Sequence, residues 1–232
     1  FCVRGDQQVE GIDYTDKYAP VVSWSTVRML FCLSISNKLS SRQVDFSNAF
    51  IHAKLAKDKH IYIALSQGFE STKGGQDKVL KLRRSLYGLV QAPIYWGNHL
   101  KEALTKVGLH PSVSDPCMFT EDGIIALTYV DDILFFGPDT TSINAKIEAI
   151  RTQGFKLTIK DDISNFLGVA IKSLTSGEIE MTQTGLIAKV LAACQMTDCN
   201  LKATPATRNH WEPIQTANRS PVNLSMHPLL EC

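Results

Sequence analysis

The chain has 232 residues, a formal net charge of +1 at pH 7, 44% apolar residues and 20% charged residues. These values are ordinary for a soluble globular protein with a sizeable core, built as one large domain or two small ones. Its apolar runs stay well short of the roughly 20 residues that a membrane-spanning helix needs, so we expect no membrane partner.

The six cysteines are scattered along the chain, without a Cys-x-x-Cys pair or a histidine cluster beside them. This pattern favours reduced thiols in a cytosolic or nuclear protein over disulfides or a zinc site. The near-neutral charge leaves nucleic-acid binding open, because a binding groove can be basic while the whole chain is not. The chain starts with Phe1 and shows no signal peptide, so we expect a segment of a longer polypeptide.

Residues 1–22 are irregular, and a helix is predicted over 26–37 with Ser25 as its N-cap. The segment 41–52 begins as a strand and then loses its regular pattern. Asp45 lies inside the apolar part of this strand, where a carboxylate is unusual. Taken alone, Asp45 is explained by a position at an edge strand or strand end, where its carboxylate faces water. A functional role for Asp45 requires further carboxylates elsewhere in the chain.

Two β-like runs, 60–65 and 78–82, are joined by a loop that contains Gly74-Gly75 and are predicted to form a hairpin. Four cations lie within seven residues at the end of this hairpin. They are Lys78, Lys81, Arg83 and Arg84. A solvated basic face and a contact with a nucleic-acid phosphate backbone explain this basic run equally well.

A helix is predicted to begin near Pro93 and to end at Gly108. Apolar residues repeat between these positions at 3.6-residue spacing, and proline suits the first turn of a helix. The stretch 110–119 contains two prolines and is predicted to be a loop.

The centre of the sequence is Tyr-Val-Asp-Asp at 129–132, flanked by the apolar runs 124–127 and 133–136. Each flank is predicted to be a short buried strand. Two carboxylates about 4 Å apart repel by about 4 kcal/mol at an effective dielectric constant near 20, and desolvation adds to that cost. A bound divalent cation offsets both terms. The alternative is an acidic hairpin turn with Asp131 and Asp132 in water.

Beyond this centre, Asp139 is predicted to cap a helix that ends at Gly154, followed by a strand over 155–159. The second acidic pair, Asp161-Asp162, has polar neighbours and is predicted to be a solvated turn. The pattern then predicts a hairpin and a final helix. Their ranges are 166–171 and 178–181 around Ser176-Gly177 for the hairpin, and 184–196 for the helix.

The middle of the chain therefore has the order β-α-β-β-α-β, which predicts an α+β fold with an antiparallel, ferredoxin-like sheet backed by helices. On such a sheet Asp45 and Asp131 lie at the ends of neighbouring central strands. The first domain is expected to cover 1–200. Residues 201–232 are rich in Asn, Thr, Pro and Arg and are expected to be a linker or a disordered tail.

Five motifs follow one another in a family-like order. They are Gln-Val-Asp-Phe-Ser-Asn-Ala-Phe at 43–50, Ser-Leu-Tyr-Gly-Leu-Val-Gln-Ala-Pro at 85–93, Ser-Asp-Pro-Cys-Met-Phe at 114–119, Tyr-Val-Asp-Asp at 129–132 and Phe-Leu-Gly at 166–168. In residues, order and spacing, the chain over 1–200 resembles the reverse transcriptase of copia-type long-terminal-repeat retrotransposons.

The resemblance implies a right-hand polymerase fold with partial fingers, a palm and the start of a thumb. It implies an RNA-directed DNA polymerase that joins a dNTP to a primer 3′-hydroxyl with two Mg²⁺ ions, or Mn²⁺ in their place. The implied partners are an RNA template, a DNA or RNA primer, and the integrase and ribonuclease H segments of the same polyprotein. The implied location is a cytoplasmic virus-like particle or the nucleus.

The same resemblance assigns roles to residues of this sequence. Asp45, Asp131 and Asp132 would be the catalytic carboxylates and metal ligands, and the Phe46 carbonyl would help to hold the nucleotide-side ion. Residues expected to line the dNTP site are Phe46, Phe50, Tyr87, Gly88 and Gln91. Among these, the ring of Phe50 would exclude a ribose 2′-hydroxyl. The hairpin 166–181 would grip the primer, and Arg4 would belong to the basic fingers strand.

Three departures from the family pattern qualify these expectations. The basic fingers residues expected upstream of Phe1 are missing, Ser66 replaces a usual proline, and the resemblance stops near Pro205. A truncated, non-catalytic remnant that at most binds nucleic acid is therefore the alternative. A nucleotidyl cyclase on a similar sheet is less consistent, because cyclases lack the motif at 85–93. The three intact acids favour the polymerase.

Overall fold

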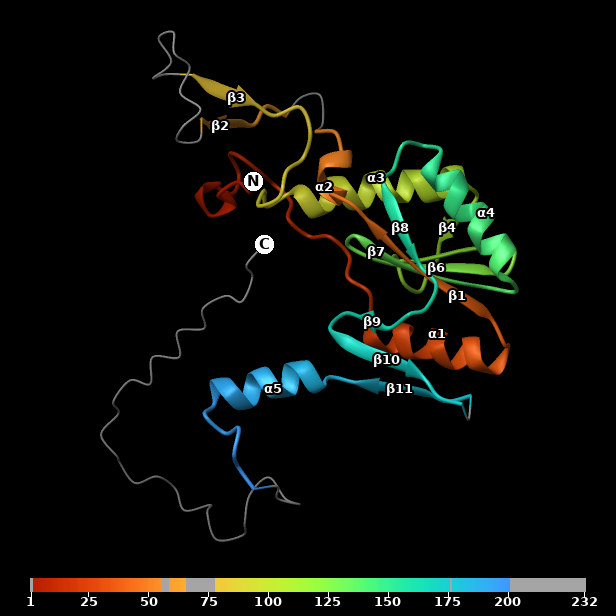
Figure 1. The fold of residues 1–232 in the computed structure, drawn as a ribbon. Helices are drawn as coiled ribbons and strands as arrows, with labels where there is room; N and C mark the ends of the chain where they lie inside the picture. Colours follow the sequence, from red (N-terminus) through yellow and green to blue (C-terminus); the bar gives the residue numbers. More distant parts are fainter. Residues whose placement is uncertain (1, 56–58, 66–77, 176, 201–232) are drawn as a thin grey trace. The chain divides into compact units, whose positions relative to one another are not determined.

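The computed structural model describes residues 2–55, 59–65, 78–175 and 177–200 (Figure 1). By its internal contacts the chain divides into two units, Phe1–Thr182 and Gln183–Cys232. The predicted loop at Gly74-Gly75, Ser176 of the second hairpin and the predicted tail 201–232 lie outside the described residues.

The first unit is organised around a sheet of six strands in the order β4-β5-β6-β7-β1-β8. Each neighbouring pair is antiparallel. The strands are β1 (Ser40–Phe46), β4 (His110–Pro111), β5 (Met118–Glu121), β6 (Ile124–Tyr129), β7 (Asp132–Gly137) and β8 (Leu157–Lys160). The predicted antiparallel sheet is confirmed, and β4 and β5 extend it beyond the predicted strands.

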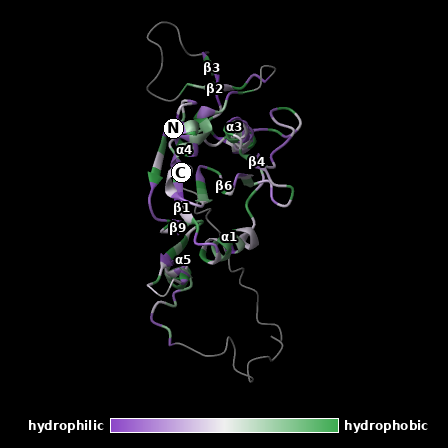
Figure 2. Cartoon of the chain, turned by 90° about the vertical axis from the view of Figure 1, so that its right-hand side faces the viewer, coloured by the Kyte–Doolittle hydropathy of each residue, from purple (hydrophilic) through white to green (hydrophobic). Residues whose placement is uncertain are grey.

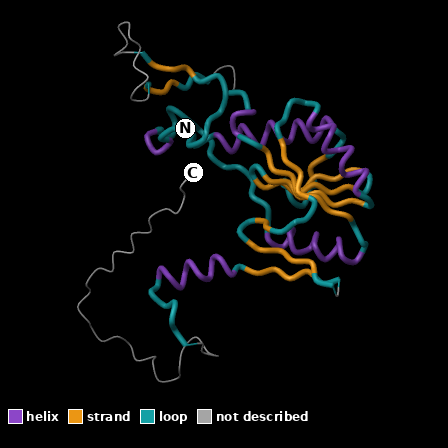
Figure 3. The backbone as a smooth tube through the Cα atoms, in the orientation of Figure 1, coloured by secondary structure: helices purple, strands orange, loops and turns teal. Residues whose placement is uncertain are grey.

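Three long helices cover the two faces of this sheet, as Figures 1 and 3 show. Helices α3 (Ala92–Lys106) and α4 (Thr140–Arg151) lie on one face, and α1 (Trp24–Ser36) lies on the other. In the perpendicular view of Figure 2, strand β6 lies between α1 and α3. The sheet is therefore the middle layer of three.

Alternating side chains of the central strands divide the core into two clusters, because successive strand residues point to opposite faces. The cluster with α3 and α4 includes Val44, Phe46, Trp96, Leu104, Ile133, Phe135, Ile143 and Ile147. The cluster with α1 includes Val27, Leu30, Phe31, Leu127, Leu134, Phe136 and Phe166. The short apolar runs around the acidic turn are thus buried on both faces, as predicted.

Helix boundaries follow from local capping chemistry. Asp139 caps α4 as predicted, because its Oδ1 accepts from the Ser142 N–H at 2.8 Å. Helix α1 begins at Trp24, two residues earlier than predicted, and Ser23 rather than Ser25 is its N-cap. Ser25 was the wrong choice because its own N–H is the group that the Ser23 hydroxyl satisfies.

Other boundaries also differ from the sequence prediction, including that of the strand predicted over 155–159, which is β8 at Leu157–Lys160. The stretch 110–119 contains β4 and the start of β5, so it is not wholly a loop. The run 166–171 is two strands, β9 (Asn165–Phe166) and β10 (Val169–Ser173), instead of one. The intervening Leu167 and Gly168 have φ of +53° and +73°, the conformation that reverses the chain in a two-residue hairpin.

The remaining elements are short. Strands β2 (Tyr62–Ala64) and β3 (Val79–Lys81) pair antiparallel, and β11 (Ile179–Thr182) pairs with β10, so both predicted hairpins are confirmed. Close to the amino terminus is the 3₁₀ turn η1 (Gly5–Gln7). The second unit contains α5 (Thr184–Ala193), which is three residues shorter at its carboxyl end than predicted. None of the described helices is both long and apolar enough to cross a membrane.

Replacement of Phe135 by alanine tests the importance of the central strand. Phe135 is 0% exposed, so we expect a loss of about 3–5 kcal/mol in the free energy of unfolding from the lost burial and the cavity left behind. Urea denaturation followed by circular dichroism measures this loss. Val113→Ala, at a fully exposed position, is the control and should change stability by less than about 0.5 kcal/mol. Equal effects of the two substitutions would contradict the assigned core.

Candidate active site

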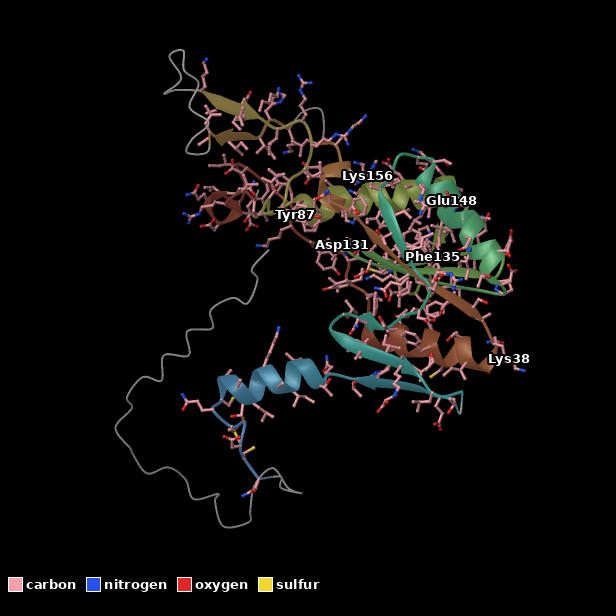
Figure 4. The ribbon with its side chains drawn as sticks, viewed as in Figure 1. Lys38, Tyr87, Asp131, Phe135, Glu148 and Lys156 are labelled. Carbon is pink, nitrogen blue, oxygen red and sulfur yellow. The ribbon has the colours of Figure 1, made fainter. Side chains whose placement is uncertain are left out.

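Strand β1 and the β6–β7 hairpin bring the predicted carboxylates to one end of the sheet. The register of β1 with β7 sets Asp45 opposite Asp132. The Phe46 N–H donates to the Asp131 carbonyl at 2.8 Å, which continues the pairing into the turn. In Figure 4, Asp131 and Tyr87 lie at the same end of the sheet, and Phe135 lies further along β7. Asp45, near the end of β1, therefore lies beside the β6–β7 turn that carries Asp131.

The turn between β6 and β7 has a strained backbone. Val130 has φ of +50°, a region in which a β-branched residue is an outlier. The indole N–H of Trp96, a residue only 1% exposed in α3, donates to the Val130 carbonyl. Strained conformations persist where surrounding contacts fix them. The buried tryptophan thus helps to hold the turn that carries Asp131.

A buried amide orients the Asp132 carboxylate. Gln43 is 2% exposed, and its Nε2 donates to Asp132 Oδ1 at 3.0 Å. Gln43 precedes Asp45 by two residues, so the two side chains share a face of β1. The Gln43 Oε1 is buried and has no hydrogen-bond partner among the described residues. Because the amide is neutral, it fixes Asp132 without removing its charge.

The surroundings of Asp131 raise its pKa. Burial raises the pKa of Asp131 above the usual aspartate range, and the negative charges of Asp132 and Asp45 raise it further, against a hydrogen bond from its own backbone N–H. Neutralising the buried negative charge of Asp131, either by protonation or by a bound cation, would therefore stabilise this end of the sheet.

The donor set at this end of the sheet consists of oxygen atoms. Hard cations such as Mg²⁺ prefer carboxylate and carbonyl oxygens, which Asp45, Asp131, Asp132 and the Phe46 carbonyl supply. In the described part of the chain, no three or more His, Cys, Asp or Glu side chains stand close enough together to hold a metal ion. Mg²⁺ is usually held by one or two carboxylates together with waters and substrate phosphates. The donors therefore fit an ion whose coordination a phosphate completes, and not a closed protein cage.

Two aromatic rings lie beside the carboxylates. Phe50, in the one-turn helix α2 (Ala49–His52), meets Tyr87 edge to face with ring centroids 4.7 Å apart. Burial raises the pKa of Tyr87, and the charge of Asp131 adds to the effect. The structure thus brings both predicted pocket residues close to the acidic turn.

Gly88 has a clear structural requirement. Its φ is +92°, and a Cβ atom there would meet the Val3 carbonyl oxygen at 2.0 Å. The neighbouring Tyr87 carbonyl accepts from the Val3 N–H at 2.8 Å, so the amino-terminal segment pairs closely with this loop. The backbone explains the glycine, and its contact with a nucleotide stays a prediction.

The Gln91 side chain is engaged within the protein. It is 5% exposed, its Oε1 accepts from Gln8 Nε2 at 3.0 Å, and its Nε2 donates to the Asp13 carbonyl at 3.4 Å. These bonds tie the start of α3 to the amino-terminal segment. A nucleotide contact of Gln91 also stays a prediction.

Sequence reasoning missed Gln43 and the polar role of Trp96. Period-two alternation was a usable signal for Gln43, because it places this residue on the same strand face as Asp45. Trp96 was predicted only as an apolar residue of a helix. Its indole N–H partner is a backbone carbonyl from another part of the chain, which no sequence pattern reveals.

Comparison with known proteins identifies the family of the chain. Residues 1–208 match the family described as reverse transcriptase (RNA-dependent DNA polymerase). The retrovirus-related Pol polyprotein from transposon RE2 of Arabidopsis thaliana is 32% identical over 222 residues, which cover 94% of this chain and 15% of the relative. The corresponding polyprotein from transposon TNT 1-94 of Nicotiana tabacum is 33% identical over 209 residues, which cover 88% of this chain and 15% of that relative.

The chain thus spans 15% of the length of each of these two relatives. The family match covers most of the chain and includes all five motifs that carried the resemblance. The chain belongs to the reverse transcriptase family, and the predicted resemblance to copia-type retrotransposon Pol polyproteins is confirmed.

Proposed function

We propose that this chain is an RNA-directed DNA polymerase domain of a retrotransposon polyprotein, which extends a primer on an RNA template with dNTPs. The pairing of Asp45 with Asp132, next to the Asp131 turn, is the observation that supports this proposal most strongly. Among the described residues, no Lys or Arg forms a salt bridge with Asp45, Asp131 or Asp132. Carboxylates without a cationic partner suit a site that binds metal-bound phosphates. The six-stranded sheet would be the palm, β2–β3 part of the fingers, and α5 the start of a thumb.

In this proposal Asp45 and Asp131 would hold two Mg²⁺ ions, with Asp132 as a looser third carboxylate and the Phe46 carbonyl as a further ligand. Bound in pairs, such ions activate an attacking hydroxyl and neutralise the leaving oxygen in phosphoryl transfer. The protein's own contribution is orientation: Trp96 fixes the turn, Gln43 fixes Asp132, and the β1–β7 register fixes the separation of the strands. The primer 3′-oxygen would form a bond to the α-phosphorus while the bond from the α-phosphorus to the oxygen bridging it to the β-phosphorus breaks. Pyrophosphate leaves, and the proton of the 3′-hydroxyl passes to water.

Phe50 and Tyr87 form the proposed sugar side of the nucleotide site. Their edge-to-face contact leaves the Phe50 ring supported on one side by Tyr87. A ribose 2′-hydroxyl would need the space that the Phe50 ring fills, so deoxyribonucleotides are selected by exclusion.

Asp131→Asn tests the catalytic assignment. It preserves shape but removes the charge that binds metal, and should lower primer extension by more than about 10³-fold on a primed RNA template with Mg²⁺ and dNTPs. The assay uses the chain preceded by the corresponding upstream segment of the RE2 relative, hereafter the RE2-extended chain. Asp162→Asn removes an equal charge from the exposed acidic turn and is the matched control. Equal activity of Asp131→Asn and wild type would end the proposal; inactive wild type with intact folding would favour the non-catalytic remnant.

The pH dependence of stability tests the desolvated charge itself. Because the folded-state pKa of Asp131 is raised, the wild type loses stability as pH rises from the unfolded-state pKa through the folded-state pKa. Without metal, Asp131→Asn should therefore be more stable than wild type at pH 7, and the difference should shrink towards pH 4. Urea unfolding in EDTA at both pH values measures it. A less stable Asp131→Asn variant at pH 7 would argue against the proposed electrostatic cost.

Phe50→Ala tests sugar selection. Removal of the ring should open space for the 2′-hydroxyl and lower the ratio of kcat/KM for dNTP over rNTP by about 10²-fold, with little effect on dNTP incorporation itself. Single-nucleotide extension by the RE2-extended chain gives this ratio. Tyr18→Ala, which removes a 74% exposed ring outside the five motifs, should leave it unchanged. Unaltered discrimination in Phe50→Ala would remove Phe50 from this role.

A further inference from the structure

The basic run at the end of β3 does not behave as one uniform surface. Its last member, Arg84, donates from Nη1 to the carbonyl oxygens of Ile51 at 3.3 Å and His52 at 3.1 Å. These are the last two carbonyls of α2, the helix that carries Phe50. Arg84 and its neighbour Arg83 are both exposed, so the two arginines differ in these backbone bonds and not in burial. A contact with the protein backbone is therefore a third role for this cluster, beside the solvated face and the phosphate contact.

Helix α2 needs such external support. It has four residues, whereas isolated helices shorter than about 12 residues are marginal in water. Its last carbonyls have no partners inside the helix, and a cation near them is favourable for hydrogen bonding and for the helix dipole. The Ser85 N–H adds a bond to the Ala53 carbonyl at 2.9 Å, directly after the helix.

The same short segment also contacts α2 through a side chain. The Tyr87 ring meets the Phe50 ring edge to face, with ring centroids 4.7 Å apart. At the beginning of α2, in the described part of the chain, Asn48 makes no side-chain capping bond. The segment Arg84–Tyr87 therefore contacts α2 at its carboxyl end and at Phe50.

We propose that Arg84 is a positioning residue for sugar selection: by bonding the carboxyl end of α2, it fixes the Phe50 ring against Tyr87 at the distance that excludes a 2′-hydroxyl. This inference rests on the proposed function, in which Phe50 makes the exclusion. Arg84 itself touches neither substrate nor metal. A flexible α2 would let the ring move aside, and small displacements at such sites have large kinetic effects.

Substitution of the two neighbouring arginines separates the three roles. Arg84→Gln in the RE2-extended chain should lower the dNTP-over-rNTP ratio of kcat/KM by about tenfold, the effect of losing a charged hydrogen bond. Arg84→Lys, which keeps a cationic donor, should restore part of the ratio. Arg83→Gln removes an equal charge one residue away and should leave the ratio unchanged. If both Gln variants instead weaken primer–template binding equally, with a reduced salt dependence and an unchanged sugar ratio, Arg84 is a phosphate contact and the proposal is wrong.

A double-mutant cycle tests whether Arg84 acts through Phe50. In a Phe50→Ala background, Arg84→Gln should cause no further loss of sugar discrimination, because the ring that it positions is gone. Independent, multiplicative effects would overturn the proposal. Relaxed sugar discrimination in Phe50→Ala but not in Arg84→Gln would reject only the positioning role of Arg84. Unchanged sugar discrimination in Phe50→Ala would reject the proposed role of Phe50 in sugar selection.

Hydrogen exchange supplies a readout that needs no activity. Amide exchange at residues 49–53 should be faster in Arg84→Gln than in Arg83→Gln or wild type, with the central strands equally protected in all three. Equal protection of 49–53 in the two Gln variants would show that Arg84 does not hold α2, and would overturn the proposal.

Discussion

The antiparallel pairing of β1 with β7 is the constraint on which the candidate site depends. It sets Asp45 directly opposite Asp132 and continues, through the Phe46 N–H, into the turn that contains Asp131. Both strands are buried on two faces, so a shift of register by one residue would exchange the two core clusters and is strongly disfavoured. The hydrophobic core thereby fixes the separation of charged groups that would otherwise repel one another.

That arrangement of buried charges and strained backbone has a local cost in free energy, which a hydrogen bond from a neighbouring helix partly offsets. Burial and like charge raise the pKa of Asp131, Val130 holds a positive φ, and the Gln43 Oε1 is buried without a partner among the described residues. Trp96 bonds the strained turn. Strain and perturbed ionisation at one point of a regular sheet are typical of functional sites. The proposed polymerase role gives a reason for the accumulated negative charge, because bound cations would balance it.

Much of this organisation could be predicted from the sequence, and the predictions that were wrong or missing have physical reasons. Short apolar runs and capping residues predicted the helices and central strands, since burial period and caps are local signals. The split at Leu167-Gly168 was missed because a leucine at positive φ has no sequence signature. The bonds of Arg84 and Trp96 were missed because backbone carbonyls from distant segments accept them. Family motifs indicated Asp45 and Asp131, and only the strand register shows that Asp45 lies opposite Asp132, next to the turn that contains Asp131.

The most direct test of the account is to locate metal in a complex of the RE2-extended chain with a primed RNA template, Mn²⁺ and a non-hydrolysable dNTP. Mn²⁺ replaces Mg²⁺ and can be identified by its anomalous X-ray scattering. The account predicts two Mn²⁺ ions about 3.5–4 Å apart between the Asp45 and Asp131 carboxylates, with the triphosphate bound to one of them. A bound triphosphate whose metal ions contact neither of these two carboxylates would contradict it.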